Sequence, residues 1–476
     1  MSTLDEKIKQ AFPDESVIKI PQNYSVFAGK NLPSFIKDFL IKRYTDSYGN
    51  LDRNGVLKFL EDHIPSKDND LKNRLRTHRE EVTVLTRFIV ETDLKNDKLL
   101  FSIPDLGIKS SEGRIPDHVA KKNKEIKDGE LWGVVTLVYQ PPVDKDKGFV
   151  ELVNYKAFKP YKVDLEYYRA ARKEFSTTEW IDLLIRSMEY NPDGFESLSQ
   201  KLMFLSRILI FLEPRLNMIE LAPKGTGKSY IFGNLSKYGW MISGGKVTRA
   251  KLFYDMTKKS MGAITLYDFV TMDEIQTITF SDSAEIQAAL KSYLEFGYTT
   301  VANVKLVSQA GLIIMGNISL SRDKKPIRLK YFSELPETFK ESALLDRFHG
   351  FIEGWKLPRI TEDLKINGWT LNVEYFSEIM HELRDKPIYS AIVNDLLEVP
   401  AKADTRDTTA VKRIATAYLK LLFPNVKDIS EIDKEDFNSF CLIPAIEKRQ
   451  IIRRQIHLID EEFSDEMPDI KILYNE

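Results

Sequence analysis

A short glycine-containing stretch at residues 219–230 constrains the fold of this chain more than any other feature. Its sequence is Ile-Glu-Leu-Ala-Pro-Lys-Gly-Thr-Gly-Lys-Ser-Tyr, an apolar run followed by a turn with two glycines and then a helical pattern. Gly225 and Gly227 allow the backbone to approach a ligand without a Cβ in the way. Backbone N–H groups and a helix N-terminus at such a turn surround phosphate groups. The stretch therefore predicts a phosphate-binding loop between a buried strand and a helix.

The side chains around this turn are those that a triphosphate site uses. Lys228 is expected to reach the β- and γ-phosphates of ATP, and the Ser229 hydroxyl to ligate Mg²⁺. Ala222 stands where the first glycine of the usual pattern lies, which is a mild departure because that position shapes the entry to the loop. The alternative is a glycine turn before an ordinary surface lysine. The residues expected to bind the nucleotide are Pro223, Lys224, Gly225, Thr226, Gly227, Lys228, Ser229 and Tyr230.

Composition limits the class of protein. The 476 residues suffice for two or three domains, and 43% hydrophobic with 29% charged residues is ordinary for a globular protein. The net charge of −2 provides no global field for nucleic acid, so any DNA binding must use a local patch or an assembled channel. Scattered histidines without a Cys/His cluster make a zinc site unexpected.

Targeting signals and cysteine use suggest the compartment. The single Cys441 excludes an internal disulfide framework and suits a reducing cytosol. The first residues lack the apolar core of a signal peptide. The most apolar run, Leu202–Leu212, is too short to span a bilayer and contains Arg207. We therefore expect a cytoplasmic protein that has no membrane partner.

The chain divides into four regions. Residues 1–160 predict an N-terminal α+β domain, whose second part has β-branched and aromatic runs typical of a small barrel-like β-domain. Such barrels often bind nucleic-acid strands, although a plain docking or oligomerisation domain is the alternative. A long basic loop is expected from Lys109 to Lys127. A helical linker at 161–200, within which the capping box Ser176–Glu179 opens a helix, leads to an α/β core at 201–360 and a helical lid and tail at 361–476. The predicted strands of the β-domain are 82–90, 98–103, 132–139 and 149–156.

Two adjacent carboxylates follow a largely apolar strand after the glycine-rich turn. Asp273 and Glu274 end the run Thr265–Glu274. Asp273 at the end of the strand is expected to hold Mg²⁺ through water, and Glu274 to act as general base toward the attacking water. Adjacent acids are common on protein surfaces, but the preceding strand and the position after the phosphate-binding loop favour the catalytic interpretation.

Two further polar residues complete a set in a fixed order. The strand Gly311–Asn317 ends in Asn317, an amide that can position the water opposite the γ-phosphate. Arg347 follows at the end of an element, where ring ATPases place an arginine that reaches the γ-phosphate of a neighbouring subunit. The strands between these motifs alternate with helices, which predicts a mainly parallel sheet with crossover helices.

Together these segments resemble a known family. Pro223–Ser229, Ile242–Thr248, Asp268–Glu274 and Arg406–Val411 resemble the BrxL family, Lon-related AAA+ ATPases of bacterial BREX phage-defence systems. The resemblance implies an AAA+ core similar to that of MCM helicases, in a hexameric or double-hexameric ring that encircles double-stranded DNA. Other phage-defence proteins would be further partners. Longer members carry a Lon-protease-like domain after the lid; with 52 residues after Pro424 we expect none here, and no protease activity.

The implied ring assigns roles to additional basic residues. A hairpin at 294–307 would point Lys305 toward DNA in the pore, with Lys246 and Arg249 as weaker candidates; solvated basic residues are the alternative. One residue of the lid helix would contact the nucleotide as sensor 2, and its candidates are Arg406, Lys412 and Arg413.

The sequence thus predicts an ATP-hydrolysing, DNA-binding ring motor in phage defence. Two alternatives stay open. One is a Lon-like motor that remodels protein, for which Tyr254 or Tyr267 would be the pore aromatic. The other is an interaction scaffold whose assembly is switched by ATP.

Overall fold

The computed structural model describes residues 3–30, 32–46, 49–64, 71–126, 128–143, 147–257, 259–301 and 303–473. A five-stranded sheet with spatial order β15-β7-β14-β11-β8 forms its centre, and every neighbouring pair is parallel. Numbered by their appearance in the chain, these strands lie in the order 5-1-4-3-2. The predicted mixed α/β core with a parallel sheet is confirmed. The strands are β7 (Asn217–Ala222), β8 (Gly239–Val247), β11 (Phe269–Phe280), β14 (Gly311–Asn317) and β15 (Gly350–Glu353).

Parallel strands that are covered on both faces need continuous apolar sequence, and the central strands have it. All six residues of β7 are buried, and in β14 only Asn317 is partly exposed. The helices α11 (Lys228–Asn234) and α14 (Ser283–Phe296) belong to the crossovers between strands. The carboxyl ends of β7 and β14 lie beside the middle of β11, where its pairing with β14 ends, and together they form one edge of the sheet, the carboxyl edge, where ligands bind in open α/β sheets.

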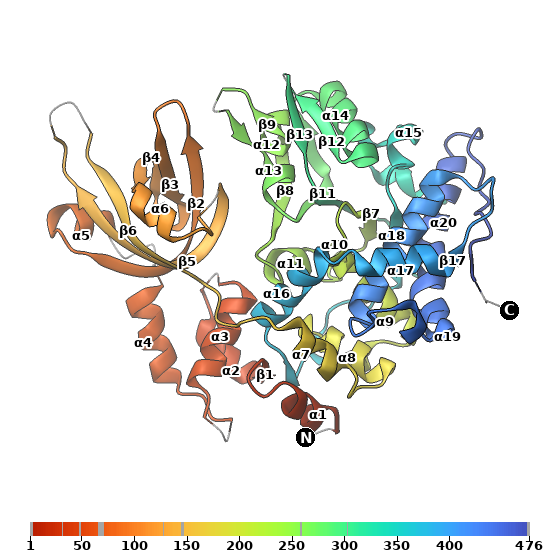
Figure 1. Cartoon of the computed structure of the whole chain (residues 1–476), viewed down its shortest axis with the longest axis horizontal. Coiled ribbons are helices and arrows are strands. Elements are labelled where there is room, and N and C mark those ends of the chain that lie inside the picture. Colours follow the sequence, from red (N-terminus) through yellow and green to blue (C-terminus); the bar gives the residue numbers. More distant parts are fainter. Residues whose placement is uncertain are drawn as a thin grey trace.

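The chain after the sheet is mostly helical and packs beside it (blue in Figure 1). Pro444 does not interrupt the C-terminal helices. The chain stays helical from Lys434 to His457, with a π-helical turn before the proline, which lies in the first turn of its helix. The helices are α16 (Val373–Arg384), α17 (Ile388–Leu396), α18 (Thr405–Leu422), α19 (Lys434–Phe437), the π-helix (Asn438–Leu442) and α20 (Ile443–His457).

The N-terminal helices share their core with these C-terminal helices. The strand β1 (Ser16–Lys19) pairs antiparallel with β16 (Gly368–Leu371). Apolar residues of the first 64 positions, such as Ile8 and Phe12, lie in one buried cluster with residues of α16 and α18. The region 1–160 therefore does not pack as one unit. The N-terminal helices are α1 (Thr3–Ala11), α2 (Pro21–Tyr24), α3 (Ser34–Tyr44) and α4 (Arg53–His63).

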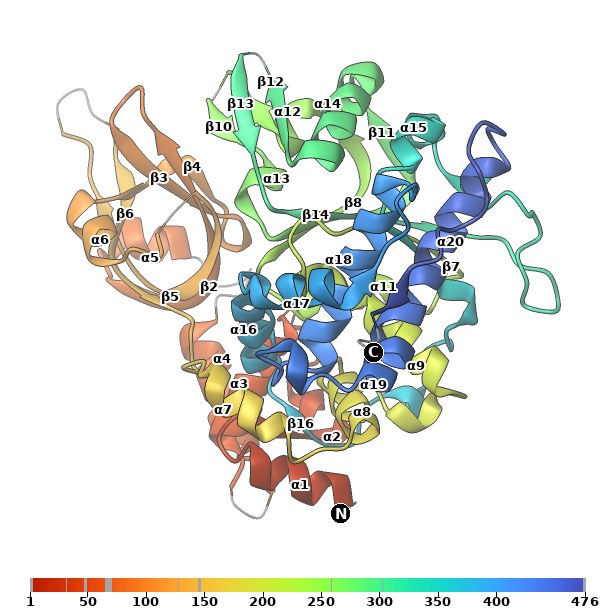
Figure 2. The ribbon, with the colours of Figure 1, turned by 45° about the vertical axis from the view of Figure 1, so that its right-hand side comes forward.

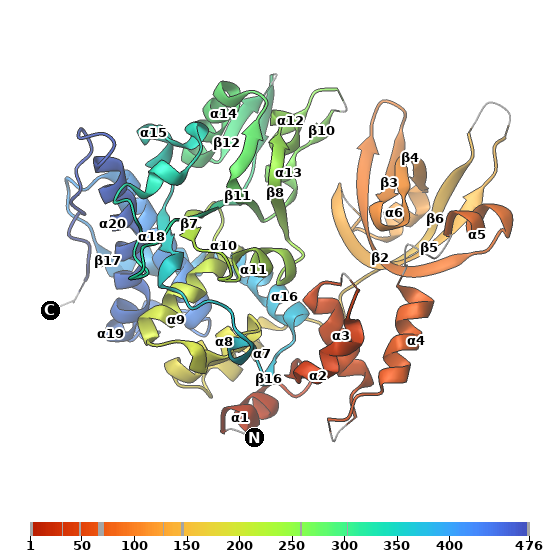
Figure 3. The same cartoon turned by 180° about the vertical axis from the view of Figure 1, so that it is seen from behind.

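Five strands form a closed barrel with order β2-β3-β4-β6-β5 and a core of their own. The barrel lies to one side of the parallel sheet (orange in Figures 1 and 3). The prediction of a long basic loop from Lys109 to Lys127 is wrong, because β4 and the helix α6 (Asp117–Lys122) occupy most of this segment. The strands are β2 (Val82–Asp93), β3 (Lys98–Ile103), β4 (Ile108–Ile115), β5 (Gly129–Gln140) and β6 (Phe149–Ala157), with α5 (Leu71–Thr77) beside them.

Shorter elements connect these parts, and several of them, such as α7, α8 and α9, can be followed in Figure 2. The capping box Ser176–Glu179 is confirmed at the start of α8. A 3₁₀ turn, Ser206–Ile208, separates the two helical segments that precede β7. Among the described residues, no helix is both long and apolar enough to cross a membrane. The remaining helices are α7 (Leu165–Arg172), α8 (Thr177–Ser187), α9 (Leu198–Leu205), α10 (Leu209–Leu212), α12 (Arg249–Leu252), α13 (Ala263–Leu266) and α15 (Ser342–Leu345). The remaining strands are β9 (Tyr254–Asp255), β10 (Ser260–Met261), β12 (Tyr298–Val301), β13 (Val304–Val307), β17 (Leu397–Glu398) and β18 (Lys471–Ile472).

Candidate nucleotide site

The glycine-rich turn leaves β7 at the carboxyl edge and enters α11. Gly225 and Gly227 have φ values of 84° and 74°, in the left-handed region that favours glycine. A Cβ on Gly227 would lie 2.2 Å from the Tyr190 hydroxyl oxygen and 2.4 Å from the Ile360 side chain, whereas one on Gly225 would meet no atom within 4 Å. Gly227 is therefore required by close packing, and Gly225 keeps the outer face of the loop open for a ligand.

Lys228 joins the loop to the end of β14. Its Nζ donates to Asn317 Oδ1 at 2.9 Å and to the Ala222 carbonyl at 3.5 Å. Only 7% of the residue is exposed, and this burial lowers the pKa of Lys228, against the opposing effect of the Glu220 and Asp273 carboxylates. In the described part of the chain, no carboxylate lies within ion-pair distance of the ammonium group. A buried cation without a close counter-ion fits an anionic ligand at this position.

The acid pair lies within β11, directly after Met272, where the pairing of β11 with β14 ends. Asp273 is buried and its Oδ1 accepts from the Glu274 N–H at 2.8 Å. The pairing of β11 with β8 is regular up to Asp273 and resumes only at Ile278. Glu274 has a φ of 50°, uncommon for a residue with a side chain, and it is exposed. Because the pairing of β11 with β8 is interrupted here, the Asp273 carboxylate is buried while the adjacent Glu274 carboxylate is exposed.

Gln276 holds the two strand ends together, a role that sequence reasoning missed. Its side-chain amide donates to the Asn317 carbonyl at 2.7 Å and accepts from the Asn317 N–H at 3.2 Å. Because both contacts are to the backbone, they fix the position of Asn317 and leave its side chain free to accept from Lys228. Gln276 lies two residues after Glu274, but nothing in the sequence indicates its partner.

A buried ion pair holds the loop from the protein interior, and sequence reasoning missed this as well. Arg207 and Glu220 are both fully buried, with Nη2 and Oε1 2.5 Å apart. Arg207 Nη1 donates to the Thr226 carbonyl at 2.7 Å. The charge of Arg207 within the most apolar run, and that of Glu220 within a buried strand, are the sequence signals that could have identified this pair.

Tyr230, expected at the nucleotide, points into a polar network below the loop. Its hydroxyl lies 2.8 Å from Ser34 Oγ and donates to the Glu189 carboxylate, and burial raises the pKa of Tyr230. A cavity of about 490 Å³ adjoins this network and is lined by Tyr190 and Ile360, the residues that touch Gly227. Tyr230 therefore borders a cavity beside the loop.

The remaining loop residues lie as follows. Thr226 is buried and its hydroxyl donates to the Pro223 carbonyl at 3.3 Å, while Lys224 and Ser229 are exposed. Ser229 and Asp273 could hold a metal together with phosphate oxygens, as Mg²⁺ sites commonly use one or two carboxylates plus substrate phosphates. Among the described residues, no group of three or more His, Cys, Asp or Glu side chains could hold a metal by itself.

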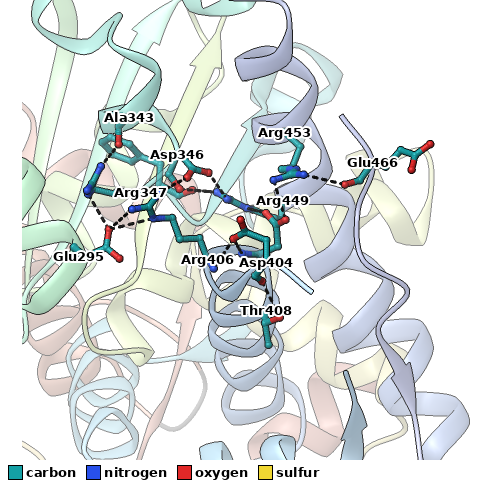
Figure 4. Close-up of polar contacts among 12 residues, drawn as sticks. Glu295, Ala343, Asp346, Arg347, Asp404, Arg406, Thr408, Arg449, Arg453 and Glu466 are labelled. Carbon is teal, nitrogen blue, oxygen red and sulfur yellow. Dashed lines mark hydrogen bonds and ion pairs between the residues drawn. The ribbon is translucent and has the colours of Figure 1, made fainter. Parts of the chain in front are cut away.

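Arg347 lies far from Lys228 in the same chain. It comes just before β15, at the amino edge of the sheet, whereas the glycine-rich loop follows β7 at the carboxyl edge. These strands have four and six residues, so at about 3.3 Å per residue the two edges are roughly 13–20 Å apart. Arg347 Nε lies 2.9 Å from Glu295 Oε2, and Figure 4 shows Arg406 on the same carboxylate, with Nη2 at 3.0 Å.

Arg406 also binds Asp346, which is part of a buried charge cluster. Arg406 Nη1 and Arg449 Nη2 lie 2.8 Å and 2.6 Å from the two oxygens of Asp346. Arg449 and Arg453 in turn contact Asp407 at 2.7 Å and 3.1 Å. The cluster fixes the start of α18 to the segment that carries Arg347. Thus the structure brings Arg406 to Arg347 and does not bring it to the glycine-rich loop.

The other sensor 2 candidates do not reach the loop either. Arg413 donates to the Pro214 carbonyl at 2.6 Å, at the amino end of β7. Lys412 lies one residue before it on α18 and is partly exposed. The structure therefore places none of the three candidates beside Lys228.

The predicted hairpin is confirmed, since β12 and β13 pair antiparallel. Lys305 on β13 is exposed, with Nζ 4.5 Å from the centre of the Tyr298 ring. Lys246 is exposed on β8, whereas Arg249 forms an ion pair with Glu285. Of the three candidates, Lys305 and Lys246 are therefore the more available for an anionic partner.

The two candidate pore aromatics differ in their surroundings. The Tyr267 hydroxyl accepts from the Glu130 N–H of the barrel at 3.1 Å, and its ring packs on Trp240 at 5.2 Å. Tyr254 is partly buried on β9. Tyr267 thus joins the barrel to the parallel sheet, and both its hydroxyl and its ring are engaged in these contacts.

A parallel α/β sheet that carries a glycine-rich turn, a buried lysine and an acid pair at one edge defines the P-loop class of proteins. A family model described as "Lon-like protease BrxL-like, ATPase domain" matches residues 150–469. A second, "BREX system Lon protease-like protein BrxL N-terminal", matches residues 10–139. The chain belongs to the BrxL family.

Two curated relatives agree with this assignment. "Lon-like protease BrxL" of Escherichia coli O9:H4 (strain HS) is 28% identical over 95% of this chain and 64% of its own length. A protein of the same name from Bacillus cereus (strain H3081.97) is 28% identical over 93% of this chain and 66% of its own length. The chain thus spans about two thirds of the length of these relatives.

Proposed function

We propose that this protein is an AAA+ ATPase of bacterial phage defence that assembles into a ring, binds double-stranded DNA and hydrolyses ATP. The observation that carries the proposal is the contact of Lys228 with Asn317 at 2.9 Å, at the edge of the sheet where Asp273 and Glu274 follow the part of β11 that pairs with β14. Three motifs far apart in sequence converge on one place beside a glycine-rich loop.

The residues at this edge fit ATP and Mg²⁺. When bound, they would supply the phosphoanhydride bond to be cleaved and the cation that offsets phosphate charge. The open face at Gly225 and the buried ammonium group of Lys228 receive the phosphates. The Ser229 hydroxyl and the Asp273 carboxylate would hold the metal. The cavity beside Gly227 offers aromatic and apolar walls for the base.

The polar side chains then have separate roles. Lys228 binds and neutralises the phosphates. Glu274, exposed and displaced from the ladder, accepts the proton of the attacking water, and the Asn317 amide orients that water. Gln276 keeps Asn317 in register with the acid pair, and so acts as a positioning residue.

The position of Arg347 supports the proposal of a ring. Because it lies at the edge opposite to its own loop, it can complete a nucleotide site only in a neighbouring subunit. Arg406 shares Glu295 with Arg347 and would reach the same neighbour. A hexamer or double hexamer of such subunits presents copies of Lys305 around a central channel for the duplex. We place this ring in the cytoplasm, with other phage-defence proteins as partners.

The ATPase proposal is tested by two single variants. Lys228→Ala and Glu274→Gln should each lower steady-state ATP hydrolysis at least 100-fold, because each removes a group that acts on the phosphates. Lys340→Ala and Glu337→Gln are the matched controls, since these residues form an exposed pair outside the site. Phosphate release is the measurement. Unchanged turnover in either site variant would refute the site.

A further inference from the structure

A second cavity, of about 810 Å³, lies between the N-terminal helices and the barrel. One wall comes from α3 and α4, and the other from β2, β5 and β6 with the segment that follows β6. The proposed ATPase chemistry uses none of its residues. Those that matter here are Arg43, Lys58, Phe59, Tyr44, Lys156 and Lys159.

The walls of this cavity are basic. Arg43 and Lys58 lie on the helical wall, and Lys156 and Lys159 on the barrel side, against the single carboxylate of Asp62. All four basic residues are exposed. Within the ranges that the structure describes, none of them forms an ion pair. Four cations that face one space from two walls attract a polyanion, although the whole chain carries a net charge of −2.

Aromatic rings lie among these charges. The Phe59 ring is stacked on His63 with centres 4.5 Å apart and planes 8° apart. The Arg43 guanidinium lies 5.7 Å from the ring centres of both Tyr44 and Phe59. All three rings are partly exposed and line the cavity. Flat rings interleaved with basic groups recognise a ligand that alternates bases and phosphates.

We propose that this cavity binds an unpaired nucleic-acid strand, with phosphates on Lys58 and Lys156 and a base stacked beside Phe59. A base can stack on a side chain only when it has left its own duplex stack, so the site selects unpaired strands. The volume, within the range of about 300–1,000 Å³ for small-ligand pockets, admits a nucleotide or two and excludes a duplex. This inference extends the proposed function, because it adds a strand site outside the ATPase ring channel.

The test measures binding of a fluorescent oligo-dT strand to the full chain, without nucleotide, over a salt series. Lys58→Gln/Lys156→Gln should weaken binding about tenfold. It should also lower the slope of log affinity against log salt by about 1.4, at roughly 0.7 for each phosphate of a single strand that is no longer neutralised. Lys98→Gln/Lys121→Gln is the matched control, since both lysines are exposed on other parts of the barrel region. Equal weakening in the two double variants would overturn the site.

A ring variant tests the stacking. Phe59→Leu keeps an apolar side chain and removes the aromatic face, so it should weaken strand binding about tenfold without changing the salt slope. Unchanged affinity in this variant, or binding of duplex as tight as that of the strand, would overturn the proposal. Comparing oligo-U with oligo-dT shows whether the bound strand is RNA or DNA, and binding of either one supports the site.

Two further variants separate this inference from the proposed function. Lys228→Ala should abolish hydrolysis and leave strand affinity unchanged. Lys305→Gln should weaken duplex binding and spare the oligo-dT strand. If hydrolysis fails to depend on Lys228 while the Lys58/Lys156 effect persists, the ATPase proposal falls and the strand site stands.

Discussion

Single buried charges set the shape of the glycine-rich loop, and Arg207 is the clearest case. Arg207→Met would leave Glu220 buried without its partner, so we expect destabilisation of about 3–5 kcal/mol. Arg207→Met/Glu220→Leu removes both charges and should recover most of that stability. Nucleotide binding should stay weak in both variants, because the Thr226 carbonyl has no donor in either of them. Urea denaturation and titration with a fluorescent ATP analogue measure the two effects. Full recovery of nucleotide affinity in the double variant would contradict the positioning role.

A second buried charge predicts a dependence of stability on pH. Lys448 is 6% exposed, and burial lowers its pKa to about 8, whereas a lysine in an unfolded chain has a pKa of about 10.4. Between these values the unfolded state binds more protons, so stability rises as the pH increases from 8 to 10.4. At pH 7 both states are protonated, and the folded state carries the full penalty of the buried charge.

Lys448→Met removes this penalty while keeping a long side chain. The variant should be more stable than the wild type at pH 7, by an amount on the order of 3 kcal/mol, and the difference should shrink toward pH 10. Melting temperatures from pH 7 to 10 measure it, with the exposed Lys340→Met as the control. A difference that does not vary with pH would show that the side chain titrates normally.

At the scale of elements, the strands with continuous apolar sequence were predictable. Gly311–Asn317 is β14 with the expected bounds, because a buried parallel strand needs uninterrupted apolar residues and ends where a polar one appears. The strand β4 was not predictable. Its sequence Ile-Lys-Ser-Ser-Glu-Gly-Arg-Ile reads as a loop, and only its neighbours in the barrel make it a strand.

The site also combines features that a local sequence pattern predicts with contacts that it does not. Lys228, Asp273 and Asn317 lie at the same edge because the strands that lead to them are parallel, and parallel strands can be inferred from their alternation with helices. Contacts that cross the molecule carry no such pattern. Arg406 and Glu295 are 111 residues apart in the sequence, and the residues around either one do not predict their contact.

The hairpin β12–β13 is the element through which we expect the duplex to be held. Lys305→Gln should weaken duplex binding in a gel-shift assay and reduce its salt dependence by about 0.9 for each phosphate that the lysine no longer neutralises. Hydrolysis without DNA should be unaffected, because the hairpin lies outside the nucleotide site. Lys340→Gln is the matched control. Equal duplex affinity for both variants at every salt concentration would exclude the hairpin from the interface.

At the scale of the whole molecule, the proposed ring would have each chain contribute residues to two different sites. Its loop, Lys228 and acid pair lie at the carboxyl edge of the sheet, and Arg347 lies roughly 13–20 Å away at the amino edge. A monomer should therefore hydrolyse ATP poorly, and activity should rise with protein concentration as subunits associate. In the proposed ring every complete site takes Arg347 and Glu274 from different subunits, so variants of the two residues should complement each other.

Mixing two inactive variants tests this directly. Arg347→Ala and Glu274→Gln should each be inactive alone. In rings co-expressed from both, a subunit with an intact Glu274 next to one with an intact Arg347 forms a complete site. With random assembly at equal amounts, about one interface in four is complete, so activity should return to about a quarter of the wild-type value. If both residues acted on the nucleotide of their own chain, every site would lack one of them and the mixture would stay inactive. Co-purification through two tags shows that mixed rings have formed, so an inactive mixed ring would refute action between subunits.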